Sequence, residues 1–383
     1  MSTAPRRRPG WQSAILQDLV FFQRGYDITK AEQKPGNIPV VSSSGVNSYH
    51  SEAKVDGPGV VIGRKGSLGT VHYVDGPYWP HDTTLWSRDF KGNLPRFVFY
   101  FLQTLGLERY DVGNSNPTLN RNHIHRLDIL LPEYQIQERI VEVLSAYDDL
   151  IENNRRRIQL LEEAARLLYR EWFVHLRFPG HEHVAIKDGV PEGWEKKTAY
   201  DVMDVLSGGT PKTKVQDYWD GDIPFYTPKD AVDYAYVGNT EKTLTEEGLR
   251  NCNSKLYPKD TVFITARGTV GKINITQTAM AMNQSCYALV AKPPINQYFL
   301  YYSLVNGVEQ FRSRAVGAVF NAIIRDTFKQ IPFVVPDVKL IQAFTGHVTP
   351  LLQQMCILST ETQKLIQARD LLLPRLMNGE IAV

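Results

Sequence analysis

The side chains best suited to chemistry in this sequence gather in short turns rich in hydroxyl, amide and cationic groups. In the first half these turns are residues 42–45, 64–67, 82–84 and 114–116, the last followed by Thr118, Asn120 and Arg121. In the second half they are residues 208–213, 226–229, 266–269 and 283–285, with Asn321 and Arg325. Arg and Lys suit phosphates and guanine edges, Asn suits adenine, and glycine permits close backbone approach. Their recurrence in both halves predicts a surface that binds nucleic acid.

A search for catalytic motifs gives little. The run at 268–272, Gly-Thr-Val-Gly-Lys, lacks both the leading Gly and the Ser or Thr of a phosphate-binding P-loop. The pairs His123/His125 and His181/His183 have no Cys or carboxylate cluster beside them, which favours solvated or hydrogen-bonding histidines over a metal site. No Asp/Asn-Pro-Pro-aromatic tetrad of a methyltransferase occurs. We therefore expect no catalytic residue and no cofactor or metal site in this chain.

Composition and charge are those of a soluble globular protein. The net charge of +2 neither demands nor excludes a polyanionic partner, so any basic surface must be local. Three widely spaced cysteines, Cys252, Cys286 and Cys356, suit a reducing compartment, and we interpret them as buried thiols. No stretch has the length and apolar character of a membrane span or signal peptide, so we expect a cytoplasmic protein without a membrane partner.

A long helix is predicted for residues 134–173, which contain no Gly or Pro and follow Pro132. At about 1.5 Å per residue it would be roughly 60 Å long, so it needs a partner. Its predicted contact positions alternate four-residue and three-residue steps, as in a coiled coil. They are Ile140, Leu144, Tyr147, Ile151, Asn154, Ile158, Leu161, Ala165, Leu168 and Trp172.

A second helix repeats this pattern at an offset of 204 residues. Its contact positions are Phe344, Val348, Leu351, Met355, Leu358, Thr362, Leu365, Arg369, Leu372 and Leu376. Either pattern alone would suit a core helix of a bundle, but the matched pair favours an internal duplication and a coiled coil. Asn154, aligned with Leu358, either fixes the register or contacts water; the pattern does not decide between them.

The duplication extends beyond the helices. Residues 9–11 match 192–194 at an offset of 183, and 36–39 match 221–224 at 185. Further on, 64–69 match 266–271 at 202, and 129–132 match 333–336 at 204. Because the offsets only increase, the second copy is the first with insertions in its loops, where insertions are tolerated.

The predicted fold class is α+β, with two repeated globular domains joined by two long antiparallel coiled-coil helices. In the first domain we expect strands at 38–41, 59–62, 70–74 and 129–131 and a helix at 97–105. The segments are a first domain at 10–133, a first long helix at 134–178, a linker and second domain at 179–336, and a second long helix at 337–378. The second domain returns the chain, which makes the helices antiparallel.

Several motifs resemble one known family. They are Pro-Glu-Gly-Trp at 191–194, Ser-Gly-Gly-Thr-Pro-Lys at 207–212, Tyr218-Trp219, Gly-Asp-Ile-Pro at 221–224, Ala-Arg-Gly-Thr-Val-Gly at 266–271, and Pro132 with Ile136 and Gln137. Together they resemble the specificity subunit of type I restriction-modification systems. The first copy departs from this pattern at 24–28, where it reads Arg-Gly-Tyr-Asp-Ile.

The resemblance implies a non-catalytic subunit that reads a two-part double-stranded DNA target, with one half-site per domain and the helices setting the gap. It also implies two modification (methyltransferase) subunits and motor-nuclease restriction subunits as partners, which would carry S-adenosylmethionine, ATP and Mg. From side-chain chemistry, we nominate Arg64, Lys65, Asn120 and Arg121 for one half-site and Lys212, Lys229, Arg267 and Arg325 for the other.

Two alternatives belong to other classes of protein. A stand-alone DNA-modifying or DNA-cleaving enzyme would need an active site, and the only hint is the nuclease-like spacing of Asp337 and Lys339. Those residues open the second long helix, where a helix-end charge pair is the better interpretation. A pure assembly scaffold would protect DNA without regard to sequence.

Overall fold

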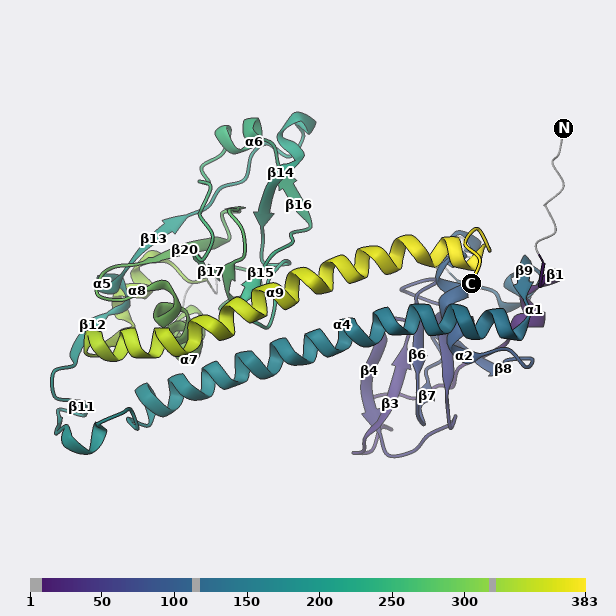
Figure 1. Cartoon of the computed structure of the whole chain (residues 1–383), viewed down its shortest axis with the longest axis horizontal. Coiled ribbons are helices and arrows are strands. Elements are labelled where there is room, and N and C mark those ends of the chain that lie inside the picture. Colours follow the sequence, from purple (N-terminus) through teal and green to yellow (C-terminus); the bar gives the residue numbers. More distant parts are fainter. Residues whose placement is uncertain (1–8, 112–117, 317–321) are drawn as a thin grey trace. The chain divides into compact units, whose positions relative to one another are not determined.

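The computed structural model describes residues 9–111, 118–316 and 322–383 (Figure 1). The chain divides into two compact units. Unit 1 comprises Met1–Leu150 and Leu365–Val383, and unit 2 comprises Ile151–Lys364. These units do not coincide with the four segments expected from the sequence, because each contains part of both long helices. No helix in the described ranges is long and apolar enough to cross a bilayer.

Unit 1 contains two main sheets. The larger has the order β2-β8-β5-β6, with antiparallel neighbours. Its strands are β2 (Phe21–Arg24), β8 (Thr84–Asp89), β5 (Gly59–Gly63) and β6 (Val71–Val74). In the smaller sheet, β4 (Gly45–His50) pairs antiparallel with β3 (Ile38–Ser42), which pairs parallel with β7 (Trp79–Pro80). The predicted strands at 38–41, 59–62 and 70–74 correspond to β3, β5 and β6.

The core of unit 1 lies between the larger sheet and α2 (Pro95–Gln103), which contacts β5 and β6. Proline in the first turn costs no hydrogen bond there, and Phe97, Val98 and Phe101 form the buried face. The ends of the domain are joined by β1 (Trp11–Ile15), which pairs antiparallel with β9 (Asp128–Pro132). Short helices complete the unit: α1 (Leu16–Leu19), η1 (Leu107–Tyr110) and α3 (Arg121–Ile124).

Unit 2 repeats this arrangement with additions. Its larger sheet has the order β13-β20-β17-β18-β15 and its smaller sheet the order β16-β14-β19. The strands are β13 (Met203–Ser207), β14 (Trp219–Tyr226), β15 (Tyr236–Val237), β16 (Lys242–Leu244), β17 (Val262–Thr265), β18 (Ile273–Thr276), β19 (Ala281–Met282) and β20 (Cys286–Ala291). A separate pair, β12 (Glu195–Thr198) and β21 (Pro332–Val335), matches β1 and β9. A short hairpin joins β10 (Ile186–Lys187) to β11 (Val190–Pro191).

The helices of unit 2 are α5 (Ala199–Val202), α6 (Glu246–Arg250), α7 (Gln297–Val316) and α8 (Arg325–Gln330), with one-turn helices η3 (His181–His183) and η4 (Gln216–Tyr218). By their order in the repeat, α5, α7 and α8 correspond to α1, α2 and α3 of unit 1. Like α2 in unit 1, α7 covers the larger sheet, at β17, β18 and β20. The same strand order in both units agrees with the duplication seen in the sequence, and the mixed helix and strand content confirms the α+β prediction.

The first long helix is α4 (Tyr134–Tyr169), which continues into the π-helical turn η2 (Arg170–Val174). The second is α9 (Val338–Met377). In unit 1, Ile140 and Leu144 of α4 share a buried core with Leu376 and Met377 of α9. Apolar burial of this kind, rather than helix propensity, provides most of the stability of such helices.

In unit 2, the later part of α4 and the earlier part of α9 share one core. Most predicted seam residues with small exposed fractions lie in one of these two cores; they are Ile140, Leu144, Ile158, Ala165, Trp172, Phe344, Val348, Met355, Leu358 and Leu376. Ile151, Asn154 and Thr362 are buried but belong to neither hydrophobic core. The remaining seam residues, Tyr147, Leu161, Leu168, Leu351, Leu365, Arg369 and Leu372, are half-buried. Leu352, absent from the predicted seam, is fully buried in the core of unit 2.

The cysteines differ from the prediction of three buried thiols. Cys286 on β20 is buried, but Cys252 and Cys356 are half-buried, so the prediction is wrong for those two. All three thiols are free. The reason is position: Cys286 is in a central strand, whereas Cys356 lies on a helix flank and Cys252 follows the short helix α6.

Candidate nucleic-acid interface

The loop that follows β5 in unit 1 is closed by its own backbone. Gly63 donates its N–H to the Thr70 carbonyl at 2.8 Å, and Gly69 donates to the Gly63 carbonyl at 2.9 Å. Gly66, at the loop tip, has φ +76°, a conformation that other residues adopt at a cost. These bonds close the loop that carries Arg64 and Lys65.

The corresponding loop after β17 in unit 2 has the same closure. Thr265 donates to the Lys272 carbonyl and Gly271 to the Thr265 carbonyl, both at 2.9 Å. Gly268 occupies the position of Gly66, with φ +75°. Lys65 therefore corresponds to Arg267, and the two copies present a cation at the same place on the same kind of loop.

In unit 1 the predicted turns come together around this loop. Arg64 and Lys65 donate their backbone N–H groups to the Thr83 carbonyl at 2.8 and 3.0 Å. The Thr83 hydroxyl in turn accepts from the Ser43 N–H at 3.4 Å. Leu119 donates to the Arg64 carbonyl at 2.9 Å, which places Asn120 and Arg121 beside the same loop. Residues distant in sequence thus form one surface.

Unit 2 assembles its turns in the same way. Ala266 and Arg267 donate to the Ser285 carbonyl at 2.7 and 3.2 Å, as Arg64 and Lys65 do to Thr83. Asn283 donates to the Tyr226 carbonyl at 3.0 Å, and Ile323 donates to the Ala266 carbonyl at 3.0 Å. The turns at 226–229, 266–269 and 283–285 therefore lie together, with α8 next to them.

Positions 208 and 209 must be glycine, because the backbone of other segments leaves no room for a Cβ atom there. A Cβ on Gly208 would lie 2.2 Å from the Asn283 carbonyl oxygen, and one on Gly209 would lie 2.7 Å from the Asn253 backbone nitrogen. The Thr210 hydroxyl then bonds the side chain of Gln284. The start of the turn at 208–213 therefore contacts the turn at 283–285.

A hollow of about 340 Å³ in unit 1 brings three of the four nominated residues together. Its lining residues are Arg24, Arg64, Leu85, Thr118, Leu119, Asn120, Arg121 and Asn122. Lys65 is exposed beside it. Arg24 was not nominated from the sequence, although the departure of 24–28 from the repeat pattern is a signal that singles it out. We call this site the arginine hollow.

The nominated residues of unit 2 are more dispersed. Arg325 opens α8 as Arg121 opens α3, and its Nη2 lies 3.4 Å from the Ser207 hydroxyl. Arg267 is exposed on its loop. Lys229 is 3.9 Å from Glu241. Lys212 is exposed, and its carbonyl accepts from the Trp219 indole at 3.4 Å. The predicted turn at 114–116 and Asn321 lie outside the described residues.

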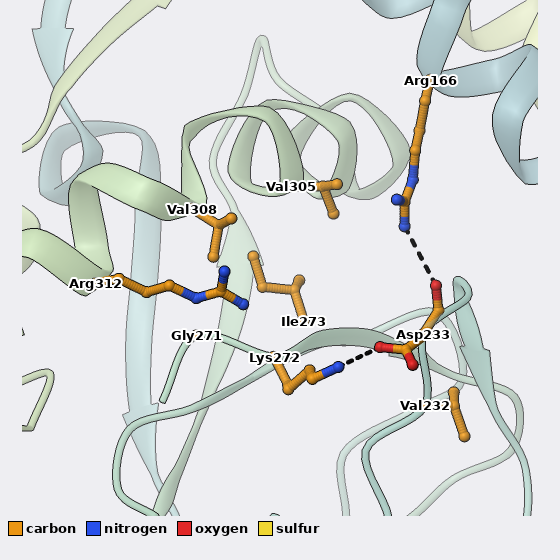
Figure 2. A pocket seen from close by; sticks show the side chains of 9 residues that line it. All are labelled: Arg166, Val232, Asp233, Gly271, Lys272, Ile273, Val305, Val308 and Arg312. Atoms are coloured by element: carbon orange, nitrogen blue, oxygen red, sulfur yellow. Dashed lines mark hydrogen bonds and ion pairs between the residues drawn. The ribbon is translucent and has the colours of Figure 1, made fainter. Parts of the chain in front are cut away.

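A second hollow, of about 290 Å³, is lined by Gly271 at the end of the 266–271 loop and by other residues of unit 2, among them Arg166, Asp233 and Lys272 (Figure 2). Figure 2 shows Lys272 pointing to the Asp233 carboxylate and Arg166 to the Asp233 carbonyl, which accepts from it at 3.4 Å. Arg166 also donates to Glu162 at 2.7 Å. Its third cation, Arg312, pairs with the Glu309 carboxylate. Since all three cations of its lining have carboxylate partners, we interpret this hollow as a structural joint between the loop and α4.

Two features bear on the enzyme alternative. The Asp337 carboxylate accepts from the Lys339 backbone N–H at 2.8 Å, so it caps the start of α9 and does not form the predicted charge pair with the Lys339 side chain. Among the described residues, no three His, Cys, Asp or Glu side chains are placed to hold a metal ion. His125 is buried, and its Nε2 accepts from the Phe22 N–H at 3.0 Å.

The sequence motifs, the repeated loops and the fold agree with a comparison to known families. A sequence model described as the type I restriction modification DNA specificity domain matches residues 9–163 and again residues 191–343. The chain belongs to this family. Members of this family recognise DNA sequence, and the two matches correspond to the two copies of the fold.

Similar proteins carry the same description. The chain is 23% identical over 356 residues to the Type I restriction enzyme HindI specificity subunit of Haemophilus influenzae, covering 75% of this chain and 78% of that protein. It is 30% identical over 152 residues to the MjaIX specificity subunit of Methanocaldococcus jannaschii, covering 39% of this chain and 35% of that protein. The crystal structure of a type I restriction-modification system S subunit from M. genitalium shares the fold, with TM-score 0.63, 16% identity and 98% of each chain covered.

Proposed function

We propose that this chain is the DNA-recognition subunit of a type I restriction-modification complex and reads a bipartite target, with one half-site per domain. The observation that carries the proposal is the repeated loop assembly. Each unit brings its own turns around a glycine-tipped loop with a cation at the same position, Lys65 or Arg267. Two similar readers in one chain suit two separate half-sites.

The proposed spacer between the half-sites is an antiparallel coiled-coil pair made by α4 and α9. In unit 1, Asp148 of α4 accepts from Arg369 of α9 at 2.7 Å. In unit 2, the Tyr169 ring of α4 lies 5.7 Å from the Phe344 ring of α9. The later residue of α4 contacts the earlier residue of α9, which supports opposite directions. Half-sites on one face of DNA recur about every 34 to 36 Å, and a rigid helical pair suits such spacing.

The proposed protein partners are two modification subunits and the restriction subunits. S-adenosylmethionine, ATP and Mg would bind to those subunits. On α4, Leu150, Leu160 and Leu167 are 49–56% exposed, and leucine in such positions suits a protein contact. This surface supports docking on the long helices.

The base and phosphate contacts proposed for the two half-sites are the residues nominated from the sequence. Arg64, Lys65, Asn120 and Arg121 would serve the first half-site. Lys212, Lys229, Arg267 and Arg325 would serve the second. Their support is placement: Arg64, Asn120 and Arg121 line one hollow, while Arg267 lies on the equivalent loop and Arg325 opens α8 next to it.

The proposal is tested by mapping methylated adenines in cells that express this chain with its modification subunit. A strain that lacks only this chain is the control. We expect a motif of two short defined parts separated by a fixed number of undefined bases. A single continuous motif, or methylation that persists in the control strain, would contradict the proposal.

A single substitution tests the second half-site. Arg267→Ala should cost about 1 to 3 kcal/mol of binding free energy and relax specificity at one position if Arg267 reads a base. Arg250→Ala, on the exposed end of α6, is the matched control. If the Arg267→Ala variant binds both target and random duplex as tightly as the unmodified chain does, Arg267 does not contact the DNA.

A further inference from the structure

We propose that the arginine hollow of unit 1 binds a backbone phosphate of the DNA, so that the first domain anchors the complex more strongly than the second. This inference rests on the proposed function. It assigns a phosphate-binding role to Arg24, which was not nominated from the sequence, and it makes Arg64 a phosphate contact and not a base contact.

Three arginines from separate parts of unit 1 line the hollow. Arg24 lies at the end of β2, Arg64 on the loop after β5, and Arg121 at the start of α3. Because they come from three directions, they suit a tetrahedral anion with several oxygens. A guanine edge is usually read by one planar guanidinium that bonds two atoms in the plane of the base.

The hollow holds more positive than negative charge. Arg24 Nη2 is 3.1 Å from the Asp82 carboxylate, and Arg64 Nη1 is 3.5 Å from the Asp82 carbonyl. The other acidic partner of Arg24 is Asp27, at 3.4 Å, with a side chain 83% exposed. Solvent weakens that second pair, so a bound anion would find cationic charge that is only partly neutralised.

The guanidinium groups of Arg24 and Arg64 also repel each other. Burial and the positive charge of Arg24 lower the pKa of Arg64, while Asp82 raises it by a smaller amount. Arg64 stays protonated at neutral pH, because arginine has a very high ordinary pKa. An anion between the two side chains would relieve this repulsion, which makes binding to the hollow more favourable than binding to one exposed arginine.

Unit 2 lacks this charge. At the offsets established for the two repeats, 183 and 202, Ser207 occupies the position of Arg24 and Ala266 that of Arg64. Arg325 alone corresponds to a member of the cluster, Arg121, and it bonds the Ser207 hydroxyl. The two additional arginines of unit 1 therefore lie at two positions, and the residues at these positions can be exchanged between the units.

The exchange provides the experiment. The double variant Arg24→Ser/Arg64→Ala gives unit 1 the residues of unit 2, and Ser207→Arg/Ala266→Arg does the reverse. Binding of the full-length chain is measured over a range of salt concentrations, with target duplex and with random duplex. Arg88→Ser is the control, because Arg88 is exposed on β8 of the same sheet and its side chain donates a hydrogen bond to Gln23 at 3.1 Å.

We expect the first variant to weaken binding to both duplexes alike, by about tenfold. The slope of log affinity against log salt should become shallower by about one, since a lost phosphate contact reduces counterion release. The reverse variant should strengthen binding to both duplexes and steepen the slope. Arg88→Ser should change neither quantity.

Two results would overturn the inference. One is loss of affinity for the target alone, with specificity relaxed at one base pair, which would make the hollow a base reader. The other is no change in either variant. If the first variant melts at a lower temperature than the unmodified chain, its weaker binding could come from unfolding. The test then rests on whether the reverse variant binds both duplexes more strongly. If the unmodified chain binds target and random duplex equally well, that result counts against the proposed function and not against this inference. The salt dependence of the variants would still show whether the hollow binds a phosphate.

Discussion

Asp148 on α4 accepts hydrogen bonds from two elements at once, Arg369 of α9 at 2.7 Å and the Tyr100 hydroxyl of α2 at 2.5 Å. This carboxylate joins both long helices to the helix that covers the sheet of unit 1. Burial and the Asp148 carboxylate raise the pKa of Tyr100, so its hydroxyl stays protonated and donates.

Substitution of Asp148 is therefore expected to loosen unit 1. Asp148→Ala leaves Arg369 and Tyr100 without this acceptor and should lower the free energy of unfolding by about 2 kcal/mol. Denaturant unfolding measures the change. Asp149→Ala, at the exposed neighbouring position, should have an effect below about 0.5 kcal/mol. Equal effects of the two variants would show that the contact contributes nothing.

Glu162 has the corresponding role in unit 2. Its buried carboxylate accepts from Arg166 at 2.7 Å, the Tyr301 hydroxyl at 3.1 Å and the Ala235 N–H at 3.2 Å. Glu162→Ala would leave two buried donors unpaired and should cost about 3 kcal/mol of unfolding free energy.

Glu163→Ala, on the exposed face of the same turn, is the control for this prediction. Glu162→Gln keeps one carbonyl acceptor and should fall between the two alanine variants. A thermal melt that ranks Glu162→Ala with Glu163→Ala would refute the role of this carboxylate.

The loop tips should be sensitive to side chains because of their backbone conformation. Gly66 has φ +76°, and a Cβ there would meet no atom closer than 3.4 Å, so the cost is conformational and not steric. Gly66→Ala should lose about 1 to 2 kcal/mol of stability or move the loop, and DNA affinity should fall.

Gly76→Ala is the matched control, because a Cβ there meets nothing within 4 Å. It should leave affinity unchanged and stability equal or slightly higher. If Gly66→Ala binds DNA as well as Gly76→Ala does, the loop tip does not need its left-handed conformation.

Stability should also depend on pH through His125. Its neutral ring accepts from Phe22, and burial, with Arg121 second, lowers its pKa below the ordinary 6.5. The unfolded chain therefore binds a proton first as the pH falls below about 6.5. The contribution of His125 to the free energy of unfolding should therefore be fully present above about pH 6.5 and decline as the pH falls. The decline should stop below the pKa that His125 has in the folded chain.

His125→Gln removes this titration. The unmodified chain should lose more unfolding free energy between about pH 7 and about pH 5 than this variant does. His183→Gln is the control, since the side chain of His183 is 83% exposed. A His125→Gln variant with the pH dependence of the unmodified chain would show that His125 does not titrate as described.

Periodicity predicted the long helices because their apolar side chains recur at fixed steps. It could not predict which side chains a neighbouring domain would cover. Leu352 is fully buried and Leu351 only half-buried, because α9 packs against the core of unit 2 as well as beside α4. Strands such as β5 were recognisable from short apolar runs bounded by turn residues.

The candidate interface was predictable only in part. The turns around Arg64 and Arg267 were visible because they repeat at a fixed offset. Arg24 was missed as a contact because its place beside Arg64 depends on the pairing of β2 with β8 and of β8 with β5. Sequence spacing gives the residues of a turn, but the strand register decides which turns meet.

The division of the long helices also affects biosynthesis. The core of unit 1 includes Leu376 and Met377, and Ile381 packs against it. A ribosome that has completed the first sheet must still synthesise the whole of unit 2 before these side chains emerge. The domain made first therefore closes last, and a nonsense codon between Lys364 and Leu376 would leave unit 2 complete and remove the buried α9 side chains from the core of unit 1.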